Sequence, residues 1–233
     1  LNKTQNGWEP QFFKKMFDFG IHQDLIVFDV KSPSPEYLPL YEAKMVTHFN
    51  YRYATYEGVD PADVENGSAR ESTVSELNSP SFDISPRCWT KREDFERRIQ
   101  GRNWPYRWLL SMRDKSRATD ERTGIFSIRP FLPANDTLPT IFLNFSPEKI
   151  AAATANLSSL VFDYFARQKV SGINFAAFVV EQLPVLPPFF YTESRLAFII
   201  PKVLELTYTS HSLAPFARDL GHDGPPFAWD EDR

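Results

Sequence analysis

The chain has 233 residues, which is long enough for one large domain or two small ones. Hydrophobic residues make up 42% and charged residues 24%, as in a globular protein with a substantial core, and the net charge of −4 taken alone argues against a nucleic-acid binder. No apolar run approaches the roughly 18 residues that a membrane helix needs, so no membrane partner is expected. The single cysteine, Cys88, cannot form an internal disulfide, which favours a reducing cytoplasm.

Residues 1–35 are treated as a separate, Phe-rich N-terminal segment. Residues 11–17 follow a proline and predict a short helix, residues 25–28 predict a buried strand, and the Pro-containing stretch 31–35 predicts a turn. We expect the phenylalanines to be core residues or a former interface with a catalytic domain that this chain lacks.

Residues 36–233 then form the second unit, beginning with a short strand and a helical turn over 38–49. Residues 57–83 carry seven acidic side chains and one basic one, Arg70. Low hydrophobicity combined with net charge predicts a mobile, solvated acidic loop there.

Local signals divide the middle of the chain into helices and strands. A capping box at Thr90 and Glu93 predicts a helix to about Gln100. Pro105 predicts a second short helix over 104–112. Alternating apolar residues predict strands over 124–129 and 140–144.

A long helix is predicted near residues 147–169, because Ser146 and Pro147 are a strong start signal. A last helix is predicted over 196–208. These elements indicate a mixed α/β (α+β) fold, a twisted sheet flanked by helices with the long helix packed across it. The apolar stripe expected on the long helix consists of Ile150, Ala153, Leu157, Leu160, Val161, Tyr164 and Phe165.

Charge is unevenly distributed along the chain. Residues 87–129 hold twelve basic and six acidic side chains, a net charge of +6 within a chain of −4. The distribution therefore permits a DNA-binding face that the total conceals.

Several chemistries lack their sequence signatures. The glycines never occur as G-x-G, and neither a P-loop nor a G-x-S-x-G elbow is present. The four histidines are scattered, so no zinc site is expected.

Basic clusters beside the ends of predicted elements instead indicate contacts with double-stranded DNA. Arginine and lysine bind phosphates, arginine reads guanine, and asparagine and glutamine read adenine. The candidate DNA-binding residues are Lys44, His48, Asn50, Arg52, Arg113, Lys115, Arg117, Arg122, Arg167, Gln168, Lys169 and Asn174.

Two alternatives remain open. Asp29, Glu42 and Lys44 match the skeleton of a Mg²⁺-dependent nuclease, in which two carboxylates hold the metal and the lysine orients water. A protein-interaction domain would instead expose Phe12, Phe13 and Phe17 as a docking patch.

Three segments carry a family resemblance: "LPLYEAKMVTHFNYRYATY", "WLLSMRDKSRATDERT" and "NLSSLVFDYFARQKVSGINFAAFVVEQLPVLPP". With the tail "LELTYTSHSLAPFARDLGHDGPPFAWDEDR", they resemble the C-terminal target-recognition region of bacterial restriction–modification DNA methyltransferases of the N6-adenine, type II or IIG-like class. Similar regions occur in methyltransferases of phage-defence systems. The resemblance covers most of residues 36–233.

The resemblance implies that the parent polypeptide binds S-adenosylmethionine and methylates adenine in a defined DNA sequence. The family's methyl-donor and catalytic motifs are missing from these residues, so we expect a fragment that recognises DNA, holds no cofactor and does not catalyse methylation alone. Its expected partners are double-stranded DNA and the catalytic methyltransferase domain of the same polypeptide. The target sequence and any DNA cleavage by the parent are not predicted.

Overall fold

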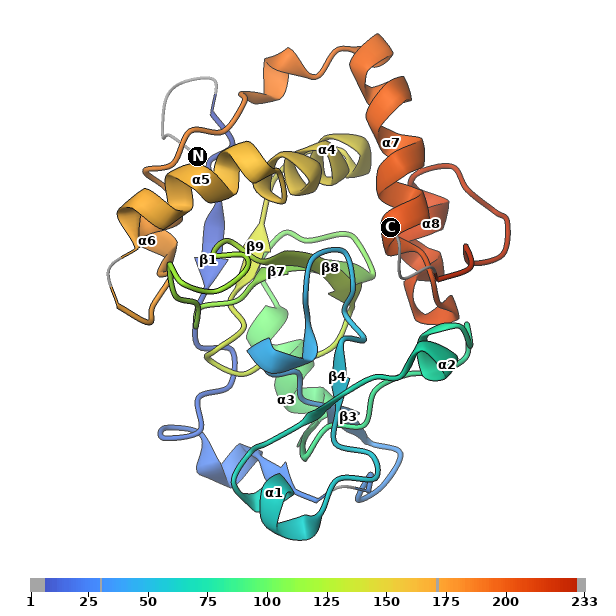
Figure 1. Cartoon of the computed structure of the whole chain (residues 1–233). Helices are drawn as coiled ribbons and strands as arrows, with labels where there is room; N and C mark the ends of the chain where they lie inside the picture. Colours follow the sequence, from blue (N-terminus) through green and yellow to red (C-terminus); the bar gives the residue numbers. More distant parts are fainter. Residues whose placement is uncertain (1–6, 30, 171, 230–233) are drawn as a thin grey trace.

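The core of the protein is a four-stranded antiparallel sheet in the order β1-β9-β7-β8 (Figure 1). The structure is a computed structural model that describes residues 7–29, 31–170 and 172–229. Leu110 of β7 lies opposite Ile128 of β8 and Ile141 of β9, which sets the register. The strands are β1 (Gln11–Phe13), β7 (Trp108–Met112), β8 (Phe126–Pro130) and β9 (Thr140–Phe142).

Two hydrophobic cores lie on opposite faces of this sheet. Trp108 and Leu110 belong to the larger core, whereas Leu109, between them in sequence, belongs to the smaller one. Alternate residues of a strand point to opposite faces, so β7 is buried on both sides.

The larger core lies under the helices that follow the sheet (Figure 1). Helix α4 packs against β8 and against α7. These helices are α4 (Pro147–Leu157), α5 (Leu160–Lys169), α6 (Ala177–Val180), α7 (Glu193–Thr207) and α8 (Ala214–Asp219), with 3₁₀ turns at Pro188–Phe190 and His211–Leu213.

The smaller core joins the central sheet to a second, three-stranded antiparallel sheet and to helix α3. A two-stranded ribbon and two short helices complete this half of the molecule. The elements are β2 (Val27–Phe28), β3 (Tyr37–Pro39), β6 (Cys88–Lys91), α3 (Arg92–Ile99), β4 (Ala54–Thr55), β5 (Arg70–Glu71), α1 (Pro61–Glu65) and α2 (Val74–Leu77), with 3₁₀ turns at Gln23–Leu25 and Ala43–Met45. The mixed α+β class is confirmed.

The prediction of one long helix over 147–169 is wrong, because the helix is interrupted at Ser158 and Ser159. The hydroxyl of Ser159 accepts the N–H of Phe162 and so caps a new helix, α5. The predicted stripe holds in α4 but not in α5, where Leu160 and Val161 are 74% and 69% exposed.

Two predicted helices are strands. Residues 11–13 pair with β9, and residues 108–112 lie between β8 and β9. A continuous apolar run suits a helix or a strand buried on both faces, and pairing with distant segments decided both cases.

Residues 7–29 and 31–35 are not separate from the rest of the described chain, which differs from the predicted boundary at residue 35. β1 is a strand of the central sheet, and the side chains of Trp8 and Phe17 are buried in the larger and smaller cores.

The acidic segment 57–83 contains α1, β5 and α2 in place of the expected irregular loop. Thr73 and Glu76 form a capping box at α2, and Arg70 makes two hydrogen bonds to the Glu76 carboxylate, at 2.9 and 2.6 Å. None of the described helices has the length and apolar character needed to cross a membrane.

Candidate nucleic-acid interface

A buried carboxylate, Asp163, joins the loop 113–123 to helix α5. Its Oδ1 accepts hydrogen bonds from the backbone N–H groups of Thr123 and Gly124, at 2.7 and 2.9 Å. Its Oδ2 lies 3.0 Å from Nε of Arg167 and 3.6 Å from Nε of Arg122. Burial raises the pKa of Asp163, but the hydrogen bonds from Gly124, Arg167 and Thr123 and the charge of Arg122 together lower that pKa below its usual value.

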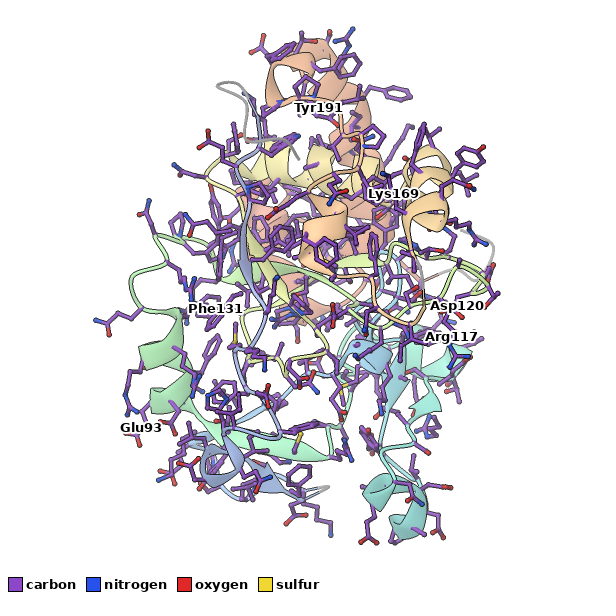
Figure 2. The ribbon with its side chains drawn as sticks, turned by 90° about the vertical axis from the view of Figure 1, so that its left-hand side faces the viewer. Glu93, Arg117, Asp120, Phe131, Lys169 and Tyr191 are labelled. Carbon is purple, nitrogen blue, oxygen red and sulfur yellow. The ribbon has the colours of Figure 1, made fainter. Side chains whose placement is uncertain are left out.

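Arg167 extends this attachment along the loop. Its guanidinium donates to the carbonyl oxygens of Ala118 and Asp120, at 3.2 and 2.7 Å, and to that of Glu121. Arg167 is therefore committed to holding the loop. Two predicted basic clusters, 113–122 and 167–174, consequently form one surface, and Figure 2 shows Arg117, Asp120 and Lys169 on the same side of the molecule.

This surface, which we call the loop–α5 surface, exposes three cations from the loop 113–123 and from α5. Lys115, Arg117 and Lys169 are exposed, and among the described residues none of them forms an ion pair. The ammonium of Lys115 donates to Oδ1 of Asn174 at 2.7 Å. Gln168 is exposed beside Lys169.

A cleft of about 900 Å³ is lined by Arg122, from the same loop, by His48 and Asn50, and by the break between α4 and α5 at Ser158. Backbone hydrogen bonds between Thr47 and Asn50 close a tight turn that carries His48. Further lining comes from α2, the end of α7 and the aromatic rings of Phe49, Tyr53 and Trp229.

Several buried polar atoms on residues that line this cleft have no hydrogen-bond partner among the described residues. They are Nδ1 and Nε2 of His48, Oγ of Ser72, Nε of Arg122 and Oγ of Ser158. The 3.6 Å between Nε of Arg122 and Asp163 is too long for a hydrogen bond. Native proteins satisfy most such atoms, so this concentration of unsatisfied ones singles out the cleft.

Burial, hydrogen bonding and nearby charges shift the pKa values of two residues that line the cleft. Burial, with the nearby Arg122 and Arg113 guanidinium groups, lowers the pKa of His48 to about 4, against the opposing effect of Asp163. The Tyr53 hydroxyl donates to the Glu71 carboxylate, and this bond together with burial raises the pKa of Tyr53 to about 12. His48 is therefore a neutral imidazole at pH 7, with one donor and one acceptor nitrogen.

Arg113 lies near this group but is largely withdrawn from solvent. Burial lowers its pKa, and its Nε has no hydrogen-bond partner among the described residues. Its charge contributes to the field around His48 and Tyr53.

The prediction that Arg52 binds DNA is wrong. Its side chain is 0% exposed, and its guanidinium donates to backbone carbonyls. The acceptors are the carbonyl oxygens of Leu77, Ser79, Phe82 and Thr209, at 2.9 to 3.1 Å. Arg52 therefore fastens the acidic segment to the C-terminal part of the chain.

Lys44, another predicted DNA-binding residue, lies apart from His48 and Asn50. Its ammonium donates to the carbonyl of Gly67 and lies 3.8 Å from the Glu42 carboxylate, so it does not line the cleft.

The structure also contradicts the nuclease alternative. Both carboxylate oxygens of Glu42 bind the guanidinium of Arg87, at 2.9 and 3.1 Å, and Oε1 also accepts the Tyr56 hydroxyl. Oδ1 of Asp29 accepts the backbone N–H of Lys31. Glu42 is buried and fully engaged, and the described residues contain no His, Cys, Asp and Glu group able to hold a metal ion.

The docking patch proposed for the N-terminal phenylalanines is not formed. Phe17 is 0% exposed, and Phe12 and Phe13 pack against the larger and smaller cores. Exposed large apolar side chains lie elsewhere, among them Tyr164 of α5 at 61% and Phe198 of α7 at 67%.

Sequence reasoning missed the residues that build the site, chiefly Asp163 and Ser158. The spacing of Asp163 and Arg167, four residues apart on a helix, was the one available signal. The contacts of Asp163 with Thr123 join residues 40 apart in sequence, and no local pattern reports them.

Comparisons with known proteins do not assign the chain to a family. No protein-family model matches the sequence, and no curated protein matches it significantly.

Proposed function

We propose that this chain is a sequence-specific DNA-recognition module of a restriction–modification or phage-defence adenine methyltransferase. In this proposal it presents a target adenine for S-adenosylmethionine-dependent N6 methylation by a catalytic domain outside these residues. The observation that carries the DNA-binding part is the loop–α5 surface, where Lys115, Arg117 and Lys169 are exposed without an ion pair among the described residues. The methyltransferase assignment rests on the sequence resemblance.

The construction of this surface supports phosphate binding. Asp163 and Arg167 hold the loop in place, so Lys115 and Arg117 are presented on an ordered backbone beside α5. Preordering reduces the entropy lost on binding. Gln168 and Asn174 lie beside these cations, and their amide groups suit adenine edges.

The described residues do not fit S-adenosylmethionine. The paired strands are all antiparallel, and the strand-to-helix turns β6–α3 and β9–α4 contain no glycine. Nucleotide cofactors are usually held at glycine-rich turns of parallel sheets. We therefore derive no methyl-transfer step within this chain.

The test replaces the three exposed cations together, Lys115→Gln, Arg117→Gln and Lys169→Gln. The slope of log K against log salt is negative, and each phosphate contact contributes up to about 0.9 to its magnitude. Loss of three contacts should therefore reduce that magnitude by up to about 3. We expect duplex DNA binding at low salt to weaken at least about tenfold. Fluorescence anisotropy with a labelled duplex across a salt series measures both quantities.

The matched control neutralises Lys31, Lys91 and Arg92, three exposed cations near the second sheet. It changes the net charge equally and leaves the loop–α5 surface intact. Equal weakening by the two triple variants would show a nonspecific charge effect and would refute this surface as the DNA-binding face.

A further inference from the structure

The residues that line the cleft beside the loop–α5 surface suit a ligand other than a DNA phosphate. A buried polar atom without a hydrogen-bond partner is destabilising, and four residues that carry such atoms, His48, Ser72, Arg122 and Ser158, line this one cavity. Its volume of about 900 Å³ lies within the usual range for small-molecule sites.

The charge of the lining disfavours a phosphate there. Arg122 contributes one positive charge, whereas Glu71 and Glu121 contribute two negative ones. His48 adds none at pH 7, because its pKa is about 4. A ligand that is neutral and carries hydrogen-bond donors meets this lining better than an anion does.

The remaining groups specify the shape and polarity of such a ligand. Phe49, Tyr53 and Trp229 offer aromatic faces that suit a planar ring. The glutamate carboxylates accept from amino groups, and the neutral imidazole of His48 offers one donor and one acceptor. A heterocycle with an exocyclic amino group and ring nitrogens satisfies both requirements.

We propose that this cleft binds an unpaired nucleobase bearing an exocyclic amino group, adenine, cytosine or guanine, with His48, Glu121 and Ser158 as its polar contacts. This inference rests on the proposed function, because Arg122 belongs to the same loop as the DNA-facing Arg117. The base is supplied by an unpaired position in bound DNA or by a free nucleoside, and the same ring chemistry serves both.

The first arm of the test compares labelled duplexes with a central bulge of one dA, one dC, one dT or one abasic site, by anisotropy. We expect the dA and dC bulges to bind at least about tenfold more tightly than the abasic one, with dT between them. In Glu121→Gln and Ser158→Ala, mild substitutions that leave the backbone bonds of both residues intact, this preference should fall at least about threefold.

The matched control is Glu57→Gln, which removes an exposed carboxylate of the acidic segment outside the cleft. It should keep the full preference for dA and dC bulges. A fall in preference equal to that of Glu121→Gln would show a general charge effect and overturn the assignment of the cleft.

The second arm titrates adenosine, cytidine, thymidine and inorganic phosphate separately, observing the His48 ring by NMR. Saturable shifts with adenosine or cytidine, but no preference among bulges, would support the nucleobase site with a free nucleoside as its source. Shifts with phosphate alone, or no preference among bulges and no nucleoside binding, would overturn the inference. Salt-dependent binding of a fully paired duplex would persist in that case, so the proposed function would stand separately.

Discussion

Arg52 and Arg129 are buried, and among the described residues neither of them forms an ion pair with a carboxylate. Arg129 is 0% exposed and donates to Ser111 and Thr140 hydroxyls and to backbone carbonyls, while burial lowers its pKa to about 9. A hydrogen bond to a charged group typically contributes about 1.5–3 kcal/mol, so both arginines serve the stability of the fold. Residue type alone therefore does not identify a DNA contact.

His48 should make the protein sensitive to acid. Its pKa is about 4 in the folded protein, against 6.5 as the reference value, because of burial and the Arg122 and Arg113 charges, with Asp163 opposing. Below pH 6.5 the unfolded chain binds the proton more readily, so the free energy of unfolding falls as pH drops from 6.5 to 4. Between pH 7 and pH 5 we expect a contribution of about 1–2 kcal/mol from this residue.

His48→Gln keeps a polar side chain and removes the titration. Urea unfolding at pH 7 and pH 5 should show a smaller loss of stability in this variant than in the wild type. If the two proteins lose the same free energy over that interval, His48 is not protonated on unfolding and the assignment of its shifted pKa is wrong.

At the scale of elements, the break between α4 and α5 determines which side chains of α5 are buried and which are exposed. Ser158 ends α4, with its carbonyl accepting a 2.6 Å hydrogen bond from Arg122, and Ser159 starts α5. The new helix buries Phe162, Asp163 and Ala166 rather than the continuation of the α4 stripe. Asp163 is therefore placed against the loop 113–123, where it accepts the backbone N–H groups of Thr123 and Gly124.

Asp163→Asn should release the loop from α5. The variant loses the negative charge beside Arg122 and Arg167, and we expect a loss of stability of about 2–4 kcal/mol. The amides of Thr123 and Gly124 should exchange with solvent at least about tenfold faster, because their acceptor is weakened. Hydrogen–deuterium exchange with NMR or mass-spectrometric detection measures this effect.

Asp120→Asn is the control within the same loop, because the one hydrogen bond that the Asp120 carboxylate accepts from the described residues is an exposed bond from the backbone N–H of Arg117, at 2.8 Å. Its effect on Thr123 and Gly124 should be small. Unchanged exchange at these two amides in Asp163→Asn would contradict the role of Asp163 as the attachment of the loop.

At the scale of the whole molecule, the net charge of +6 in residues 87–129 does not form one face. Arg87 is paired with Glu42, Arg102 lies 4.1 Å from the centre of the Phe13 ring, and Arg107 lies 4.7 Å from that of Phe131. Figure 2 shows Phe131 and Glu93 on the opposite side from Arg117. The candidate interface depends on a few cations gathered from separate segments.

The continuity of the fold through the N-terminal segment predicts that residues 1–35 are needed for folding. Their removal takes β1 from the sheet and the buried Trp8, Met16 and Phe17 from the two cores. At about 1.5–3 kcal/mol for each large side chain, the loss approaches the whole stability of a typical domain. Circular dichroism of the truncated chain should show no cooperative thermal transition.

A graded version of this test keeps the chain intact. Phe17→Ala should cost about 3–5 kcal/mol, whereas Phe28→Ala, at a position 58% exposed, should cost clearly less. A truncated chain that still unfolds cooperatively, or equal costs for the two substitutions, would restore the boundary at residue 35 that the sequence suggested.

Local sequence signals predicted the mixed fold class, the strands near 124–129 and 140–144, the start of a helix at Pro147 and the helix over 196–208, whereas α8, which follows that helix, was not predicted. The sequence also predicted most of the residues around the candidate interface, but not which of them remain free. Tertiary structure decided that residues 108–112 form a strand, that the helix breaks at Ser158, and that Arg52 is buried while Arg117 is exposed. These outcomes depend on hydrogen bonds and packing between segments distant in sequence, such as Asp163 with Thr123 and Arg52 with Thr209, whose energies outweigh local preference.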